Sequence, residues 1–202
     1  MQLQTSQSDK GRDRILSAAA ILFCEHGYAG VSMRKIADSC EMKAGSLYYH
    51  FKSKDQILTE VLNIGIKKVH AAVATALADT PEDTPAIGKL RRAISGHLHA
   101  LLEYSSFTSA NVRIFRQVPT DIQLSNLDVR RAYEALWDGF LNELTEAGYL
   151  RDDVDPRSLR LMLIGALNAT LEWYDPKVRN IAYLADHYTD MLANGILAER
   201  NI

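Results

Sequence analysis

The amino-acid sequence predicts an all-α protein. Apolar residues recur at spacings of three and four along most of the 202-residue chain, which is typical of amphipathic helices. No segment shows the alternation of apolar and polar residues that indicates a strand. Glycines and prolines fall between the apolar stripes, as at Gly27, Pro119, Gly148 and Pro176. With 47% hydrophobic residues, the chain can bury a substantial core.

Residues 33–50 contain two short helical patterns joined by a turn of about two residues. Ser32 precedes the first pattern, in the position of a helix N-cap. Helices this short cannot form a core alone, so they must pack against a third element. The apolar stripe of the helix expected from Arg12 to His26 can provide it. This arrangement suits a helix-turn-helix, whose second helix enters the DNA major groove.

A capping-box pattern at Ser53 and Gln56 begins a long helix that we expect to reach about Leu77. Its length is sufficient to leave one domain and enter another, which predicts a first domain at residues 1–54 and a second at 55–202. We expect Thr84 and Asp155 to cap later helices that begin with proline. The helices of the second domain are expected at about 85–104, 108–117, 127–147, 156–173 and 180–197.

The charge is unevenly distributed between these two domains. Residues 1–54 hold eight Lys or Arg against five acidic residues, a net charge of +3, so the remainder of a chain with formal charge -2 carries -5. A mildly basic segment beside an acidic one favours contact with nucleic acid through one end of the protein.

The second short helix and its flanks contain the residue types that bind DNA. We expect Lys43 to reach a base or phosphate, and Tyr49 to stack on a sugar or a thymine methyl. For Tyr48 and His50, core packing and helix termination are the alternative roles. The complete set of expected DNA-contacting residues is Ser32, Arg34, Lys43, Ala44, Gly45, Ser46, Tyr48, Tyr49, His50, Lys52 and Lys54.

These residues and their flanks resemble the DNA-binding domain of the TetR family of transcriptional regulators. The matching positions are Gly27, Tyr28, Ser32, Ile36, Ala37, Gly45, Leu47, Tyr48, His50, Phe51, Lys54 and Leu58. The resemblance covers about residues 12–58. It implies a three-helix helix-turn-helix domain, joined by a long helix to a C-terminal helical bundle that binds ligand and dimerises. It also implies a repressor that binds a palindromic double-stranded DNA operator and is released by a small-molecule effector.

The turn departs from the family pattern. It reads Cys40-Glu41-Met42, where Ala-Gly-Val is common in the family. Glu41 therefore replaces a glycine that often has positive φ, which predicts a strained turn. Its carboxylate would also lie near DNA phosphate and weaken binding.

The C-terminal half is similar to family members that regulate fatty-acid, sterol or aromatic-acid breakdown, on the basis of residues 148–150, 155–156 and 165–176. This similarity implies an acyl-CoA thioester or a hydrophobic acid as the effector. Arg113 and Arg116 could bind a carboxylate or CoA phosphate, or be ordinary surface residues. The other candidates could instead be core. The candidate ligand-binding residues are Tyr104, Phe107, Arg113, Phe115, Arg116, Trp137, Phe140, Asn168 and Leu171.

The last two helices are expected to pair with those of a second copy, which makes a homodimer with a four-helix interface. Within the first of these helices, we expect Leu163 and Leu167 at that interface.

Two other classes of function remain as alternatives: a helical-bundle enzyme and a sequence-independent architectural DNA-binding protein. The sequence contains no phosphate-binding loop, GxSxG or HExxH motif, and His97 and His99 point to different helix faces. We therefore expect no enzyme activity, no metal and no cofactor. No signal peptide or membrane span is apparent in the sequence, which favours a cytoplasmic protein.

Overall fold

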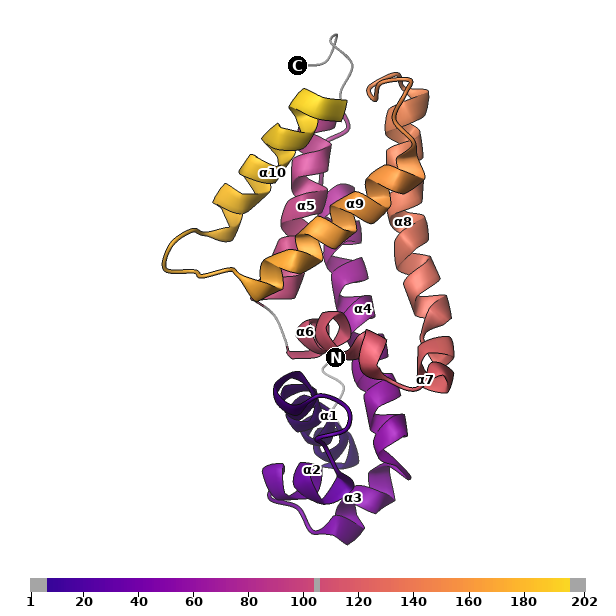
Figure 1. Cartoon of the computed structure of the whole chain (residues 1–202), viewed down its shortest axis with the longest axis vertical. Coiled ribbons are helices and arrows are strands. Elements are labelled where there is room, and N and C mark those ends of the chain that lie inside the picture. Colours follow the sequence, from indigo (N-terminus) through magenta and orange to yellow (C-terminus); the bar gives the residue numbers. More distant parts are fainter. Residues whose placement is uncertain (1–6, 104–105, 197–202) are drawn as a thin grey trace. The chain divides into compact units, whose positions relative to one another are not determined.

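The computed structural model describes residues 7–103 and 106–196, and within these ranges it contains helices and no strands (Figure 1). The all-α prediction is therefore confirmed. The helices are α1 (Gln7–His26), α2 (Met33–Ser39), α3 (Ala44–His50), α4 (Lys54–Ala78), α5 (Ala86–Leu102), α6 (Ser106–Ile114), α7 (Thr120–Ser125), α8 (Leu127–Glu146), α9 (Pro156–Ala169) and α10 (Ile181–Ile196), with 3₁₀ turns η1 (Phe115–Gln117) and η2 (Thr170–Glu172).

The chain forms two compact units. The first comprises residues 1–66 and 105–129, and the second comprises residues 67–104 and 130–202. Helix α4 passes from the first unit into the second. The segment that holds α6, η1 and α7 belongs to the first unit, although the sequence division assigned it to the domain at 55–202.

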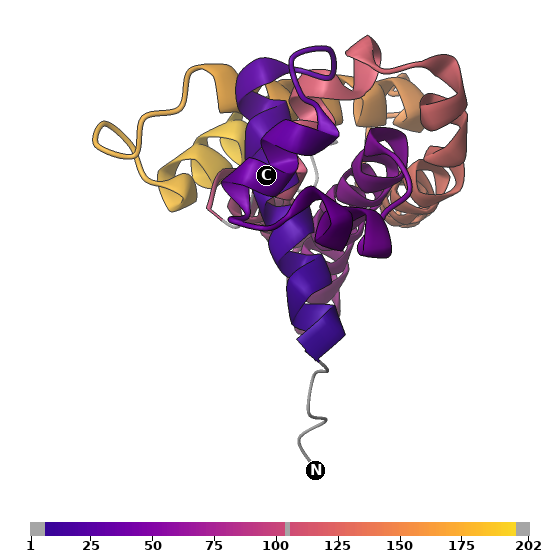
Figure 2. The same ribbon diagram turned by 90° about the horizontal axis from the view of Figure 1, so that it is seen from below.

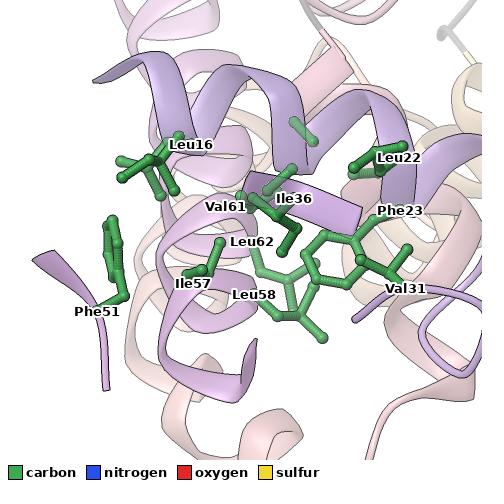
Figure 3. Close-up of a cluster of buried hydrophobic side chains, with 14 of the residues drawn as sticks. Leu16, Leu22, Phe23, Val31, Ile36, Phe51, Ile57, Leu58, Val61 and Leu62 are labelled. Atoms are coloured by element: carbon green, nitrogen blue, oxygen red, sulfur yellow. The ribbon is translucent and has the colours of Figure 1, made fainter. Parts of the chain in front are cut away.

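The core of the first unit lies between α1, α2 and α4 (Figure 3). Two short helices, α2 and α3, follow α1 through tight connections (Figures 1 and 2). Helices α6 and α7 and their connection contribute Ala110, Ile114, Val118 and Ile122 to the same core. The largest fully buried side chains in this unit are Ile15, Leu16, Phe23, Ile36, Leu47, Phe51, Ile57, Leu58 and Leu62.

Helices α4 and α6 approach each other closely at Gly65. A Cβ atom at Gly65 would lie 2.3 Å from the carbonyl oxygen of Phe107, so only glycine allows this contact. One turn earlier on α4, the carbonyl oxygen of Leu62 accepts a hydrogen bond of 2.8 Å from the side-chain amide of Asn111. Asn111 is buried, so this bond satisfies a polar group that water cannot reach. Together, the two contacts fix α4 against α6.

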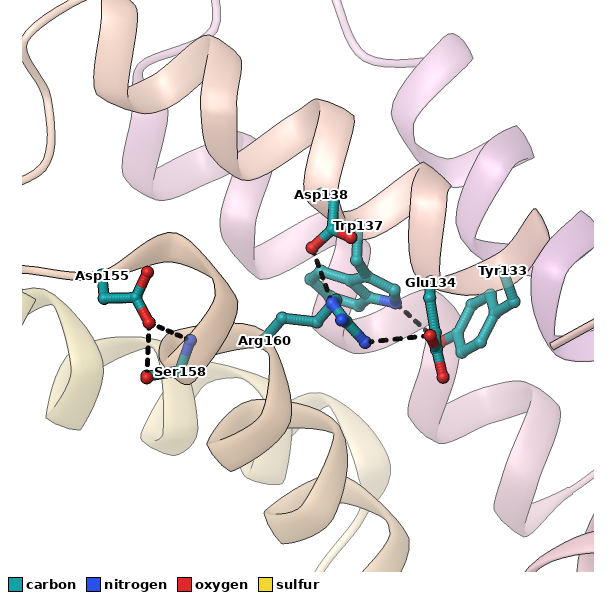
Figure 4. Close-up of polar contacts among 7 residues, drawn as sticks. All are labelled: Tyr133, Glu134, Trp137, Asp138, Asp155, Ser158 and Arg160. Carbon is teal, nitrogen blue, oxygen red and sulfur yellow. Dashed lines mark hydrogen bonds and ion pairs between the residues drawn. The ribbon is translucent and has the colours of Figure 1, made fainter. Parts of the chain in front are cut away.

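The helix ends expected from the sequence are mostly confirmed. The Ser32 hydroxyl accepts from the Lys35 amide at 3.2 Å, and the Asp155 carboxylate accepts from the Ser158 amide at 2.9 Å (Figure 4). The Ser53 hydroxyl likewise accepts from the backbone of Gln56. Gly27 and Gly148 follow their helices with φ of +66° and +71°, the left-handed conformation that glycine tolerates best.

One expectation about a helix end is wrong, and one helix was not expected. Thr84 does not cap α5: Pro85 occupies the N-cap position with extended ψ of 151°, and the helix begins at Ala86. The Thr84 amide is used instead in a turn with the Pro81 carbonyl. Helix α7 was not expected, because its six residues are too few to show a clear period.

In the second unit, α5 packs against α9 and α10. Arg91 of α5 pairs with Asp186 and Asp190 of α10, at 2.9 Å and 3.5 Å. Arg160 of α9 has a side chain that is only 8% exposed, and it pairs with Asp138 at 2.6 Å and Glu134 at 3.6 Å (Figure 4). A buried guanidinium requires such partners, so these carboxylates fix α9 against α8.

Helix α4 has the length and composition of a possible membrane span. A core helix of a soluble protein meets the same criterion, and Ile57, Leu58, Val61 and Leu62 of α4 are fully buried in the first unit. Packing in the first unit therefore accounts for part of the apolar composition of α4.

Candidate functional site

Helix α3 buries a single side chain, Leu47, and exposes most of the others. Lys43 precedes it as an N-cap residue with extended backbone. No atom lies within 4 Å of the position that a Cβ would take at Gly45, so the surface is open there. Tyr49 is 81% exposed, an unusually high value for an aromatic side chain. The face of α3 is thus free to enter a groove.

Nine of the eleven residues expected at DNA are exposed, and His50 and Lys54 are half-buried. Lys54 donates a hydrogen bond of 3.0 Å to the carbonyl oxygen of Tyr28, and its ammonium lies 3.9 Å from the centroid of the Tyr28 ring. Lys54 therefore already holds the end of α1 against α4. The hydroxyl of Ser32 caps α2. Arg34 has a side chain that is 90% exposed and lies 3.9 Å from the Asp38 carboxylate.

Further polar contacts fix α1 and the end of α3 on α4. The Tyr28 hydroxyl donates to Asp55 at 2.7 Å, and this bond is the main cause that raises the pKa of Tyr28 to about 12. Arg12 of α1 forms an ion pair with Glu60 of α4 and lies over the ring of Phe51. These contacts hold α1 and the residue that follows α3 against α4, and so fix the position of α3.

The turn between α2 and α3 contains the strain that the sequence predicted. Glu41 has φ of 53°, and it is the one non-glycine residue with positive φ in the part of the chain that the structure describes. This conformation costs about 1 kcal/mol for an L-residue. Its carboxylate lies 3.6 Å from Arg14, but both side chains are largely exposed, so the pair contributes little stability.

The candidate ligand-binding residues are distributed over both units. Phe107, Arg113, Phe115 and Arg116 belong to the first unit, whereas Trp137, Phe140, Asn168 and Leu171 belong to the second. Tyr104 lies outside the described residues.

Burial distinguishes these candidates. Trp137 and Phe140 are buried core residues whose rings meet edge-on at 6.2 Å. Asn168 and Leu171 are half-buried, and Arg113 and Arg116 are exposed.

The second unit also contains a buried polar chain that the sequence did not reveal. The indole nitrogen of Trp137 donates to the Tyr133 hydroxyl at 2.7 Å, and that hydroxyl lies 2.6 Å from Nδ1 of His97. Nε2 of His97 in turn lies 3.2 Å from the amide oxygen of Asn168. His97 occupies the apolar stripe of α5, where a histidine signals a buried hydrogen-bonded group.

The direction of this chain follows from its two ends. Trp137 can only donate, so the Tyr133 hydroxyl accepts from it. The amide oxygen of Asn168 can only accept, so His97 carries its proton on Nε2 and donates to it, and Nδ1 of His97 accepts from the Tyr133 hydroxyl. Burial is the main cause that lowers the pKa of His97 to about 4, so the imidazole is neutral at pH 7. The amide hydrogens of Asn168 remain available at the half-buried end.

We predict that His97 makes the protein less stable in mild acid. The unfolded chain binds the proton near the ordinary pKa of 6.5, but the folded chain binds it only near the lowered pKa of about 4. The free energy of unfolding should therefore fall by about 3 kcal/mol between pH 6.5 and 4, and change no further below that. Urea titrations across this range would measure it. His97→Gln should remove this component, and an unchanged pH profile in that variant would contradict the assignment.

Among the described residues, no group of three His, Cys, Asp or Glu side chains is placed to hold a metal ion.

Comparison with known proteins identifies two family models in the chain. Residues 15–61 match the model described as bacterial regulatory proteins, tetR family. Residues 83–196 match the model described as tetracyclin repressor-like, C-terminal domain, which covers more than half of the chain.

Two similar curated proteins span nearly the same length. The fatty acid metabolism regulator protein of Bacillus subtilis is 25% identical over 186 residues, which are 91% of this chain and 94% of that protein. The HTH-type transcriptional repressor KstR2 of Mycolicibacterium smegmatis is 29% identical over 176 residues, which are 85% of this chain and 82% of that protein.

Two solved structures show the same fold. AibR in complex with isovaleryl coenzyme A and operator DNA has a TM-score of 0.78 at 22% identity, covering 90% of this chain and 97% of that one. FadR from Bacillus subtilis in complex with stearoyl-CoA has a TM-score of 0.75 at 22% identity, covering 91% and 98%. The two family models together with the helix-turn-helix surface show that the chain belongs to the TetR family of bacterial regulatory proteins, whose members are DNA-binding transcriptional regulators rather than enzymes.

Proposed function

We propose that this protein is a cytoplasmic, dimeric repressor that binds a palindromic operator through α3 of each protomer. An acyl-CoA thioester, or a hydrophobic acid related to it, binds the helical C-terminal part and releases the protein from DNA. The exposed face of α3 is the observation that carries the proposal, because its side chains have no packing role in the protomer.

The DNA contacts follow from how a helix-turn-helix docks. The second helix lies in the major groove, with its N-terminal residues nearest the base edges. Lys43, Ala44 and Ser46 therefore face bases, while Arg34 and Lys52 flank them and bind phosphates. Half-buried Lys54 would bind a phosphate while its ammonium group also donates to the carbonyl oxygen of Tyr28.

A dimer is supported by exposed apolar surface on α9 and α10. Leu161 and Met162 of α9 are 59% and 54% exposed, and Tyr183 and Met191 of α10 are 46% and 53% exposed. Large apolar side chains gathered on two helices suggest a protein–protein interface. Gly165 on α9 is exposed and has no side chain, which would let a second helix approach closely. Because the dimer is two-fold symmetric, each protomer would present its α3 to one half-site of a palindrome.

The interface residues expected from the sequence need revision. Leu163 and Leu167 are 2% and 0% exposed within the protomer, so they belong to its own core. Leu161 and Met162, on the opposite side of α9, are the better candidates for contact with a second copy.

Support for the effector class comes from the similar structures that hold isovaleryl coenzyme A and stearoyl-CoA. In this chain, Asn168 ends the buried polar chain and retains amide hydrogens that could bind a carbonyl oxygen. Release of DNA requires the effector to bind the non-DNA conformation more tightly, since equal affinity for both would shift nothing. Continuous α4 could transmit the change, because Gly65 and Asn111 fix it to α6.

For DNA binding, we predict that Lys43→Ala and Tyr48→Ala weaken operator affinity by about 1–3 kcal/mol while helicity is unchanged. Gel-shift titrations of the region upstream of the gene at several salt concentrations would measure both effects. Lys177→Ala, which removes the same charge from the loop between α9 and α10, is the control and should bind normally. Normal operator binding by both Lys43→Ala and Tyr48→Ala would exclude α3 as the DNA-binding surface.

For the dimer, we predict that Leu161→Asp gives monomers that bind the operator poorly, because the carboxylate would be buried against the partner. Sedimentation would measure the mass. Leu124→Asp is a matched control, since Leu124 is 60% exposed on α7, a helix that is not part of the proposed interface. A dimer that persists in Leu161→Asp would exclude α9 as the interface.

For the effector, we predict that stearoyl-CoA or isovaleryl-CoA raises the melting temperature and releases the operator. A ligand at 100 times its Kd adds about 2.7 kcal/mol to the stability of the folded state. Asn168→Ala should reduce the shift, whereas Asn194→Ala, on exposed α10 surface, should not. Coenzyme A alone and the free acids are the comparison ligands. No shift with any thioester would exclude this effector class.

A further inference from the structure

The exposed surface of α3 contains one side chain, that of Lys43, of the types that read a purine base through paired hydrogen bonds. Its exposed residues, with Lys43 at the N-cap, are Lys43, Ala44, Gly45, Ser46, Tyr48 and Tyr49. Lys43 can bind guanine in this way, but none of the others is Arg, Asn or Gln, the further types that bind guanine or adenine with two hydrogen bonds. Apolar and aromatic groups instead recognise the thymine methyl, the one apolar feature of the base edges in the major groove. The two tyrosines on this face therefore favour contact with thymine.

Tyr49 is 81% exposed, against 55% for Tyr48, yet its ring is supported. The imidazole of His50 meets the ring edge-on, with centroids 5.2 Å apart and an interplanar angle of 83°. A side chain that is held before binding loses less conformational entropy on contact with DNA. Tyr49 is therefore prepared for an apolar contact.

The support for Tyr49 continues into α1. His50 is half-buried, and its Nε2 lies 3.1 Å from the position that a Cβ would take at Gly11. A Cβ at this distance would crowd the imidazole, so the glycine at position 11 leaves room for the ring of His50. Helix α1 thus supports the exposed ring of Tyr49 indirectly: Gly11 leaves room for His50, and His50 contacts the ring.

We propose that Tyr49 contacts the 5-methyl group of a thymine in each operator half-site, and that His50 is a positioning residue that holds the ring for this contact. This inference rests on the proposed function in that α3 must lie in the major groove. It adds the base feature that is read and the residue that reads it. The protein should accordingly distinguish a T·A pair from a U·A pair, which presents the same hydrogen-bonding groups without the methyl.

The test begins with duplexes that the protein selects from a random-sequence DNA pool. Each thymine of the preferred site is then replaced by deoxyuridine, symmetrically in both half-sites, and Kd is measured. At one position per half-site, loss of the methyl should weaken binding about fourfold per contact and about fifteenfold for the symmetric pair. Tyr49→Ala should make the thymine and deoxyuridine duplexes equal at that position, and Tyr49→Phe should keep the difference because the ring remains.

His50 has its own test. His50→Ala should reduce the ratio of the two Kd values at the same position, whereas His50→Phe, which keeps a ring edge against Tyr49, should retain it. A general loss of structure would weaken both duplexes alike without changing that ratio. Lys52→Ala, which removes a charge expected at phosphate, is the control and should also weaken both duplexes equally.

The outcomes separate this inference from the proposed DNA surface. The inference is wrong if no thymine is sensitive to loss of its methyl, or if the sensitivity persists in Tyr49→Ala. It is also wrong if Tyr49→Phe loses the sensitivity. In those cases the surface still stands if Lys43→Ala and Tyr48→Ala weaken binding. Normal binding by all three α3 variants, Lys43→Ala, Tyr48→Ala and Tyr49→Ala, would overturn both proposals.

Discussion

The contact between α4 and α6 is the constraint on which the first unit depends. Helix α4 starts directly after α3 and carries Ile57, Leu58, Val61 and Leu62 into the core. Its approach to α6 is set by Gly65, where any side chain would meet the Phe107 carbonyl, and by the bond from Asn111 to the Leu62 carbonyl. The base of the DNA-binding surface is thus fixed to a segment that lies more than forty residues later in the chain.

Buried polar groups play a corresponding role in the second unit. Arg160 joins α9 to α8 through two carboxylates, and the chain from Trp137 to Asn168 joins α5, α8 and α9. Every member of that chain has a defined donor or acceptor role, so the three helices can pack in few alternative ways. A ligand that bonds to Asn168 would add one more member to a chain whose direction is already set.

The sequence predicted most of the helices because their apolar periods and caps are local. Ser32, Ser53, Asp155 and the two capping glycines needed no knowledge of the rest of the chain. The exposed face of α3 was also predictable, since a helix of seven residues that buries only Leu47 must leave most of its other side chains at the surface. The sequence could not reveal which elements share a core, as with α6 and α7, nor that Leu163 and Leu167 face inward. Those outcomes depend on contacts between residues that are distant in the sequence. The same holds for the hydrogen bonds of buried His97 with Tyr133 and Asn168.

The shared core of the first unit bears on how such regulators diversify. Its apolar cluster includes Ala110, Ile114, Val118 and Ile122 from α6, α7 and their connection, so residues 1–66 alone would leave part of that cluster open to water. The DNA-binding part is consequently not a module that recombination could exchange by a single crossover. In a functional chimera between family members, the exchanged residues 1–66 would have to be accompanied by residues 105–129. Otherwise, the residues 105–129 that remain would have to fit the apolar surface of the new DNA-binding part.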